Sequence, residues 1–410
     1  MQPTAAPVTI IRNAEVFAPE PLGYRDVVIA GERITAVTVP NAVHVQGLPV
    51  LEHDASGAML TPGFIDNHVH VLGGGGGLGF ASRAPELQMS QLTRVGTTTV
   101  IGMLGFDATT KSMAALVAKT KAFREDGISA YALTGATLEH PVPTLTGRIR
   151  TDIVFVEEII GVGEISVSEM GYGYDSLGQG AQYIAEAATE ALLAGRLAGK
   201  RGFLCLQVPP YGGSCLKPLF EMLDKTGLPM GQLIPSHVNQ SPAYMEDALQ
   251  WGQRGGWIDI GANYTPDNGY DRAMSPTRGV RRLLEGGVPA NRILLSTDGN
   301  GAPPREESRE GQPARASYMP VGALHAAYRE LVLTGELTPD LALAAVTSNV
   351  ATATGLVRKG RIAPDMDADL VLFDNDWDIR HVWARGRKMV EDGDPVQRGR
   401  FDKVLLDELS

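Results

Sequence analysis

Short apolar runs that alternate with helix-like stretches constrain this chain more than any other feature of its sequence. Such alternation favours a parallel sheet covered by helices, because each crossover brings the chain back to begin a neighbouring strand. The runs lie at 59–70, 97–104, 128–135, 159–168, 202–208, 233–238, 256–262 and 292–298. Eight runs predict an α/β fold of the (β/α)8 TIM-barrel type, with an open doubly wound sheet as the alternative.

Helical periodicity is clearest in three of the intervening segments. Residues 111–127, 179–200 and 241–256 carry apolar side chains at helical spacing and end near glycine. Both properties are typical of helices, so we expect a helix in each segment.

The two ends of the chain differ in residue pattern from its middle, because β-branched residues are concentrated there in short runs. These runs lie at 8–17, 25–31, 33–39, 368–374, 379–386 and 387–393. We therefore predict a small β-sandwich domain formed by residues 1–58 and 359–400. The catalytic barrel is expected over 59–358, and residues 401–410 are expected to form a C-terminal tail.

Composition limits the classes of partner. Hydrophobic residues make up 43% of the 410 residues and charged residues 20%, and no apolar stretch of about 18 residues could span a bilayer. The first residues lack the pattern of a secretory signal, so the cytoplasm is the expected location. The formal net charge of −11 is spread along the chain, which argues against binding to phosphate backbones. We expect a small-molecule substrate, with neither nucleic acid nor membrane as partner.

Ionisable residues stand at the ends of four predicted strands. His68 and His70 are two positions apart on the first strand, so both side chains face the same side. Glu164 lies in the fourth strand, His237 ends the sixth and Asp298 ends the eighth. Barrel enzymes gather their chemistry at these strand ends, and buried charges there need a metal ion or another partner. The pattern predicts a divalent-metal site.

Several longer motifs resemble the amidohydrolase superfamily and, within it, the isoaspartyl dipeptidases. They read TPGFIDNHVH from Thr61, HVHVLGGGGG from His68, GISAYALTGA from Gly127, LIPSHVN from Leu233, LLSTDGNG from Leu294 and GRIAPDMDADLVLFD from Gly360. The similarity runs across nearly the whole chain. It implies an enzyme that hydrolyses an amide bond through a metal-activated water, with Zn²⁺ as the expected ion and a homo-oligomer as the expected assembly.

The resemblance also assigns roles to the five strand-end residues. His68 and His70 would bind a first metal ion, Glu164 would bridge two ions, and His237 would bind the second. Asp298 would be both a metal ligand and the catalytic general base. Gln207 stands where the pattern places a histidine, and a neutral amide is a weak ligand for a zinc-type ion. We expect one tightly bound ion and a weakened second site.

The positions that would hold the charged ends of an isoaspartyl dipeptide have changed. The residues expected to line the pocket are Gly77, Thr137, Gln240, Ala302, Tyr172 and Tyr211. None of the first four can form the bidentate ion pair that arginine makes with a substrate carboxylate. We therefore expect a substrate different from standard isoaspartyl dipeptides, such as a larger or less charged amide, lactam or imide.

Two further interpretations of the same metal site stay open. An activated water can also open a cyclic imide or lactam, or displace ammonia from a ring, and the reverse reaction closes a ring. A homologue that had lost turnover would act as a binding protein. The glycine run 73–77 lacks the Lys-Ser/Thr of a phosphate-binding loop and favours an active-site loop instead.

Overall fold

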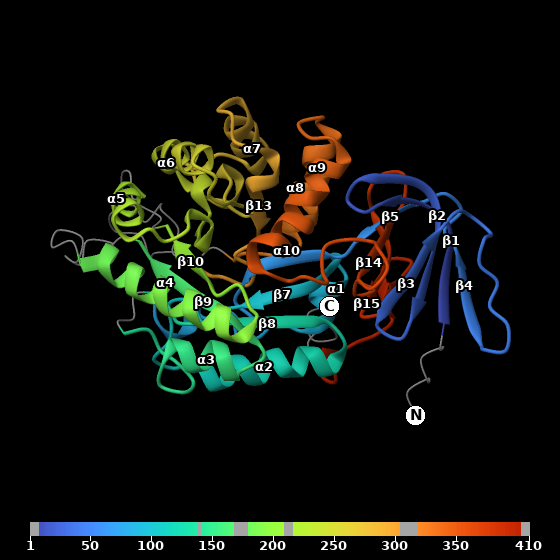
Figure 1. Ribbon diagram of the computed structural model, residues 1–410, viewed down its shortest axis with the longest axis horizontal. Coiled ribbons are helices and arrows are strands. Elements are labelled where there is room, and N and C mark those ends of the chain that lie inside the picture. Colours follow the sequence, from blue (N-terminus) through green and yellow to red (C-terminus); the bar gives the residue numbers. More distant parts are fainter. Residues whose placement is uncertain (1–7, 138–140, 168–178, 209–215, 304–317, 403–410) are drawn as a thin grey trace.

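A nine-stranded sheet built from both ends of the chain lies beside a group of parallel strands from its middle (Figure 1). The computed structural model describes residues 8–137, 141–167, 179–208, 216–303 and 318–402. Within these ranges, no helix combines the length and the apolar character needed to cross a membrane.

The first sheet has nine strands, in the order β17-β16-β15-β14-β5-β1-β2-β3, with β4 paired to β1. Its strands from the first part of the chain are β1 (Val8–Phe17), β2 (Pro21–Ala30), β3 (Arg33–Thr38), β4 (Val50–Asp54) and β5 (Met59–Pro62). Those from the last part are β14 (Leu370–Phe373), β15 (Ile379–Ala384), β16 (Arg387–Glu391) and β17 (Asp394–Pro395). The β-rich runs at both ends therefore form a single sheet, because β14 pairs antiparallel with β5.

The stretch 59–70, expected as one strand, is divided between the two sheets. β5 belongs to the nine-stranded sheet, and β6 (Phe64–Val69) opens the parallel sheet. Gly63 separates them at a close approach, since a Cβ atom there would lie 2.2 Å from Thr98 Oγ1. The expectation of one continuous strand was wrong because apolar runs on either side of a glycine look continuous in sequence.

Eight parallel strands form the middle of the chain. They are β6, β7 (Thr97–Gly102), β8 (Ser129–Thr134), β9 (Ile159–Ser166), β10 (Phe203–Gln207), β11 (Leu233–Ser236), β12 (Ile258–Gly261) and β13 (Ile293–Ser296). The first six make one sheet in chain order, and β12 pairs with β13. A bridge between Val69 and Gly299 links β6 to the end of β13. Between β11 and β12 the described residues form no backbone ladder, and the Asn239 amide instead bonds to both backbone groups of Gly261.

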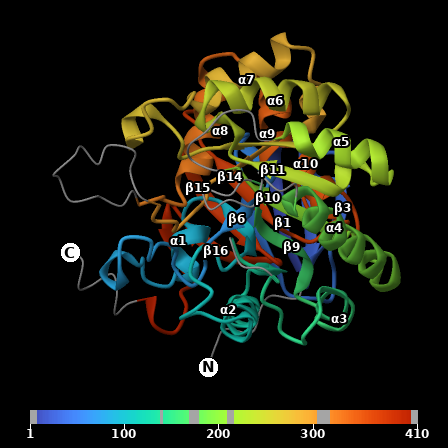
Figure 2. The same cartoon turned by 90° about the vertical axis from the view of Figure 1, so that its left-hand side faces the viewer.

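Ten helices are described around these strands. They are α1 (Met89–Thr93), α2 (Met113–Asp126), α3 (Ile149–Phe155), α4 (Gln179–Ala198), α5 (Lys217–Thr226), α6 (Pro242–Gln253), α7 (Pro276–Glu285), α8 (Ala323–Leu333), α9 (Pro339–Val346) and α10 (Ser348–Thr354). Figure 2 shows helices on several sides of the parallel strands. The three expected helices are confirmed as α2, α4 and α6. The Ser112 side chain accepts a hydrogen bond from Ala115 N–H at the start of α2, and Gly127 ends it with φ of 118°.

One buried cluster brings the parallel strands together. It contains apolar side chains from strands that are far apart in sequence, packed with α10. Among them are Ile65, Ile101, Leu133, Phe203, Ile234 and Leu294. The strands therefore share a common apolar interior.

Candidate metal centre

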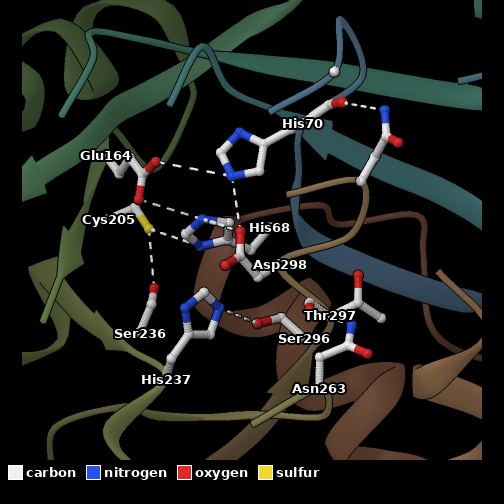
Figure 3. A network of polar contacts seen from close by, with 12 residues as sticks. His68, His70, Glu164, Cys205, Ser236, His237, Asn263, Ser296, Thr297 and Asp298 are labelled. Carbon is white, nitrogen blue, oxygen red and sulfur yellow. Dashed lines mark hydrogen bonds and ion pairs between the residues drawn. The ribbon is translucent and has the colours of Figure 1, made fainter. Parts of the chain in front are cut away.

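The five residues expected to hold metal lie at the carboxyl ends of the parallel strands, and all are buried. His68 is in β6 and His70 follows it, while Glu164 is in β9. His237 follows β11 directly, and Asp298 is the second residue after β13. The structure brings all five together, as Figure 3 shows.

Four of these side chains meet closely. His68 Nε2 lies 3.4 Å from Glu164 Oε2 and 3.7 Å from Asp298 Oδ1. His70 Nε2 lies 2.7 Å from Asp298 Oδ1 and 3.9 Å from Glu164 Oε1. His68, His70 and Asp298 each offer a ligand atom within 4.8 Å of the others. Two imidazoles and two carboxylates thus surround one small space.

His237 lies on the other side of His68. The centroids of the two rings are 4.3 Å apart. Its Nε2 lies 3.2 Å from Ser296 Oγ, and that hydroxyl donates to Asp259 Oδ2 at 2.7 Å. His68, His237 and Asp259 form a second group with ligand atoms within 4.8 Å of one another. The two groups share His68.

Gln207 ends β10 beside Ser236 of β11 and is half-buried. Its Oε1 is buried and has no hydrogen-bond partner among the described residues. Cys205 lies earlier on the same strand, with Sγ 3.1 Å from Ser236 Oγ and 3.8 Å from His68 Nδ1. The thiol is buried and forms no disulfide.

Backbone conformation fixes where two of these side chains point. His237 and Asp298 both adopt the left-handed region, with φ of 59° and 54°. Non-glycine residues rarely occupy this region, and such strain is concentrated at functional sites. The Asn300 amide holds the chain after Asp298 by donating to His70 O and Pro85 O.

The electrostatics of the cluster favour a cation. Burial raises the pKa of Asp298, but the contacts with His70, His237 and His68 outweigh it and hold that pKa below its usual range. Burial likewise opposes ionisation of Glu164, yet His68 and His70 keep its pKa below the ordinary value. Two ionised carboxylates therefore lie in a buried space. His68 Nε2 is equally buried and has Glu164 Oε2 at 3.4 Å.

The residues expected to line the substrate pocket differ in how far they are exposed to solvent. Gly77 is exposed, whereas Gln240 and Ala302 are buried. Thr137 is half-buried and its backbone N–H donates to Gly105 O at 3.1 Å. Gln240 Nε2 lies 3.5 Å from Val208 O, close to the end of β10. Tyr172 and Tyr211 lie outside the described residues.

The glycine run packs against the loop that follows Asp298. A Cβ atom at Gly74 would lie 2.7 Å from Gly301 Cα, and one at Gly75 would lie 2.8 Å from Ala302 Cβ. Gly75 also has φ of 84°. Small residues are required here because two backbones approach each other at the mouth of the site.

Sequence reasoning missed three residues of the site, Asp259, Ser296 and Tyr264. The Tyr264 hydroxyl donates to Asp298 Oδ2 at 2.7 Å, and its ring stacks on His237 with centroids 4.9 Å apart. Asp259 lies within β12, and Tyr264 is the third residue after it. Asp259 and Ser296 are polar residues inside the predicted strands 256–262 and 292–298, which is the signal that could have found them. Tyr264 lies beyond its strand and carries no such signal.

Comparison with known proteins agrees with this geometry. Residues 265–392 match the model of the amidohydrolase family. The structure is similar to that of a beta-aspartyl dipeptidase from Fervidobacterium islandicum AW-1, solved in complex with a beta-Asp-Leu dipeptide. The TM-score is 0.83 and the identity 32%, over 95% of this chain and 98% of that one. The chain belongs to the amidohydrolase family. The resemblance to isoaspartyl dipeptidases inferred from sequence is confirmed.

Other similar proteins are more distant. The chain is 24% identical to adenine deaminase 2 of Desulfotalea psychrophila, over 83% of this chain but only 51% of that protein. It is 25% identical to imidazolonepropionase of a Ruegeria species, over 78% of this chain and 79% of the relative. A D-hydantoinase structure matches with TM-score 0.66 at 16% identity, over 95% of this chain and 97% of that one. That likeness shows the fold alone. The family match and the dipeptidase structure together support a hydrolase with a TIM-like α/β part and a β part.

Proposed function

We propose that this amidohydrolase is a metal-dependent hydrolase that cleaves an amide bond in a small molecule. The observation that carries the proposal is the convergence of His68, His70, Glu164 and Asp298 around one buried space, with the separations given above. Imidazole and carboxylate are ligands that Zn²⁺ prefers. A cation there would neutralise two carboxylates that burial otherwise disfavours.

We propose one tightly bound ion at these four residues and a weaker second site at His237. A second ion would need a further ligand near His237, and the described residues offer Asp259 and the neutral amide of Gln207. The Asp259 carboxylate already accepts the Ser296 hydroxyl, and burial raises its pKa to about 7. Both properties make the second site poorer than the first.

The bound ion would supply a Lewis acid and lower the pKa of a water molecule. The residues of this chain would orient the reactants and move protons. Asp298 Oδ1 faces the histidine pair, where it can accept a proton and return it to the leaving nitrogen. The neighbouring histidines hold the carboxylate ionised, which is the form a proton acceptor needs.

The substrate is proposed to be less charged than a beta-aspartyl dipeptide. Gly77, Thr137, Gln240 and Ala302 bring no charge to the mouth of the site. A dipeptide with a free carboxylate and amine would leave water without gaining ion pairs from these four residues, which disfavours binding. A larger or less charged amide satisfies the same pocket better.

Hydrolysis of a cyclic amide or imide is the second candidate. By name, the adenine deaminase and the imidazolonepropionase act on ring compounds. The same ligand cluster and proton acceptor serve ring opening, ring closure and deamination. The choice of substrate therefore depends on the pocket walls.

We also propose that the eight parallel strands close into a (β/α)8 barrel within 59–358, and that residues 1–58 and 359–400 form the small β-sandwich domain. β5 (Met59–Pro62), at the boundary, pairs with the strands of this second domain. The link between β6 and the chain after β13, together with the shared apolar interior, supports this arrangement. Residues 401–410 are proposed as a tail.

The decisive experiment combines metal analysis with a substrate panel. Purified protein is expected to contain one Zn²⁺ per chain by elemental analysis and to hydrolyse an N-acyl amino acid or a cyclic imide faster than beta-Asp-Leu. Asp298→Asn is expected to lower kcat at least about 1,000-fold, since it removes the proton acceptor. Two tightly bound ions would overturn the one-ion assignment. Absence of both metal and turnover would favour a binding protein.

A further inference from the structure

Tyr264 is the phenol that reaches the candidate metal centre among the described residues. It follows β12, and its hydroxyl donates to Asp298 Oδ2 at 2.7 Å. The other oxygen of the same carboxylate, Oδ1, faces His70 Nε2 at 2.7 Å and His68 Nε2 at 3.7 Å. Each oxygen of Asp298 therefore has its own partner, on opposite sides of the carboxylate.

The phenol is held in place by several neighbours. Its ring stacks on His237 with an interplanar angle of 28° and lies 4.8 Å from the Tyr270 ring. A Cβ atom at Gly261 would lie 2.4 Å from Tyr264 Cδ2, so only glycine leaves room for the ring. Next to it, Asn263 Nδ2 donates to Thr297 O, which ties this segment to the residue before Asp298. Tyr264 is 2% exposed, so its position is fixed by packing.

We propose that Tyr264 is a positioning residue for Asp298, a role that rests on the proposed metal-dependent function. By occupying Oδ2, the hydroxyl directs Oδ1 towards the histidine pair and keeps the carboxylate from turning or binding an ion through both oxygens. Without the hydroxyl, Oδ2 would be a buried charged acceptor that lacks this partner, which is unfavourable. Partners of this kind orient metal ligands, and their loss typically weakens metal binding about 10- to 100-fold.

The test measures Co²⁺ binding, because Co²⁺ reports its ligand geometry through its visible absorption. The metal-free protein is titrated with cobalt chloride against a chromogenic chelator at neutral pH, and the absorption spectrum of the loaded protein is recorded. The variants are Tyr264→Phe, which removes only the hydroxyl, and Tyr328→Phe. Tyr328 is a matched control, since it is a buried tyrosine on α8 whose hydroxyl has no hydrogen-bond partner among the described residues.

Tyr264→Phe is expected to weaken Co²⁺ binding about 10- to 100-fold and to alter the Co²⁺ spectrum. Tyr328→Phe should leave both unchanged. In an Asp298→Ala background, adding Tyr264→Phe should change the Co²⁺ dissociation constant less than twofold, because the phenol then has no carboxylate to orient. The thermal midpoint of each metal-free variant separates this effect from a loss of folding.

The outcomes distinguish the two proposals. If wild-type protein binds Co²⁺ and Tyr264→Phe binds it within twofold, the positioning role is overturned while the metal site stands. If wild-type protein binds no Co²⁺, the proposed function fails and the positioning role with it. If Tyr264→Phe does not fold, Gly261→Ala takes its place. Its Cβ would lie 2.4 Å from Tyr264 Cδ2 and 3.1 Å from His237 Cδ2, so it displaces the phenol while keeping the hydroxyl, and unchanged Co²⁺ binding in that variant refutes the role.

Discussion

Gly105 lies directly against the ring of His70. A Cβ atom at Gly105 would lie 2.6 Å from His70 Cε1 and 2.8 Å from Nδ1, and the residue has φ of 76°. The position of this metal-binding candidate is thus set partly by the absence of a side chain on the neighbouring strand end.

Gly105→Ala is expected to displace His70 and weaken metal binding at least tenfold, since a ligand moved from its place loses affinity. Gly287→Ala is the matched control, because Gly287 has φ of 82° and nothing within 4 Å of the added Cβ. Both variants should lose about 1 kcal/mol of folding free energy from the positive φ. Zn²⁺ affinity by chelator competition should fall only in Gly105→Ala. Equal affinities in both variants would show that His70 does not depend on this contact.

Metal removal is expected to lower the thermal midpoint. An ion that binds only the folded state stabilises it by about 2.7 kcal/mol when its free concentration is a hundredfold above Kd. Glu164 and Asp298 would lose that counter-charge in the presence of EDTA. Differential scanning fluorimetry of the Zn²⁺-loaded protein, before and after EDTA, measures the change. A His68→Ala/His70→Ala double variant should show no such shift, and an unchanged midpoint in the wild-type protein contradicts the metal site.

Lys359 joins the two sheets. Its buried ammonium group contacts Asp369 Oδ2 at 2.5 Å and Asp367 Oδ2 at 2.8 Å, and it donates to Ser129 Oγ at the start of β8. Lys359→Met leaves the buried Asp369 carboxylate without its ion-pair partner and is expected to cost about 3–5 kcal/mol of unfolding free energy. Arg361→Met is the control. Arg361 pairs with Glu20 at an exposed position, so its loss should cost less than about 1 kcal/mol. Urea unfolding compares them, and equal losses would contradict a structural role for Lys359.

Folding stability should fall in acid partly because of His381. Burial, together with the nearby His53 and Lys388, lowers the pKa of His381 to about 4. An unfolded histidine titrates near about 6.5, so between these values the unfolded chain binds the extra proton. The stabilising contribution is therefore complete above about pH 6.5 and is lost as the pH falls towards 4. The ring centroids of His53 and His381 lie 4.4 Å apart, so a positive charge on His53 would repel one on His381.

His381→Gln is expected to lose less stability than the wild-type protein between pH 7 and pH 5 in urea unfolding. Glutamine has no proton to gain, so this part of the pH dependence disappears. His44→Gln, at an exposed position, should retain the wild-type slope. A His381→Gln slope equal to that of the wild-type protein would mean that His381 titrates normally in the folded state.

The repeating pattern of strands and helices was predictable from the sequence because each parallel strand is an apolar run bounded by turn-forming residues. The candidate ligands followed from the same pattern: His68, His237 and Asp298 each stand at a strand end, where side chains converge. Such convergence needs only the order of the strands, which chain order supplies.

Contacts that depend on packing could not be predicted in this way. Nothing in the neighbouring sequence marks Gly63 as the point where the chain passes from one sheet to the other. A side chain is excluded at this position by Thr98, which is distant in the sequence. Tyr264 was missed for a similar reason. Its approach to Asp298 depends on how the chain turns after β12 and on the room left by Gly261, and neither leaves a periodic signal.

The pairing of β5 with β14 also has a consequence for biosynthesis. β1 to β5 leave the ribosome first, whereas β14 follows only after every residue of the metal centre has been translated. Until then the nascent chain carries β5 as an unprotected edge, the kind of surface that recruits other unfinished chains. Truncated translation products should therefore aggregate rather than accumulate as folded fragments, and shielding of this edge by a chaperone would raise the yield of complete protein.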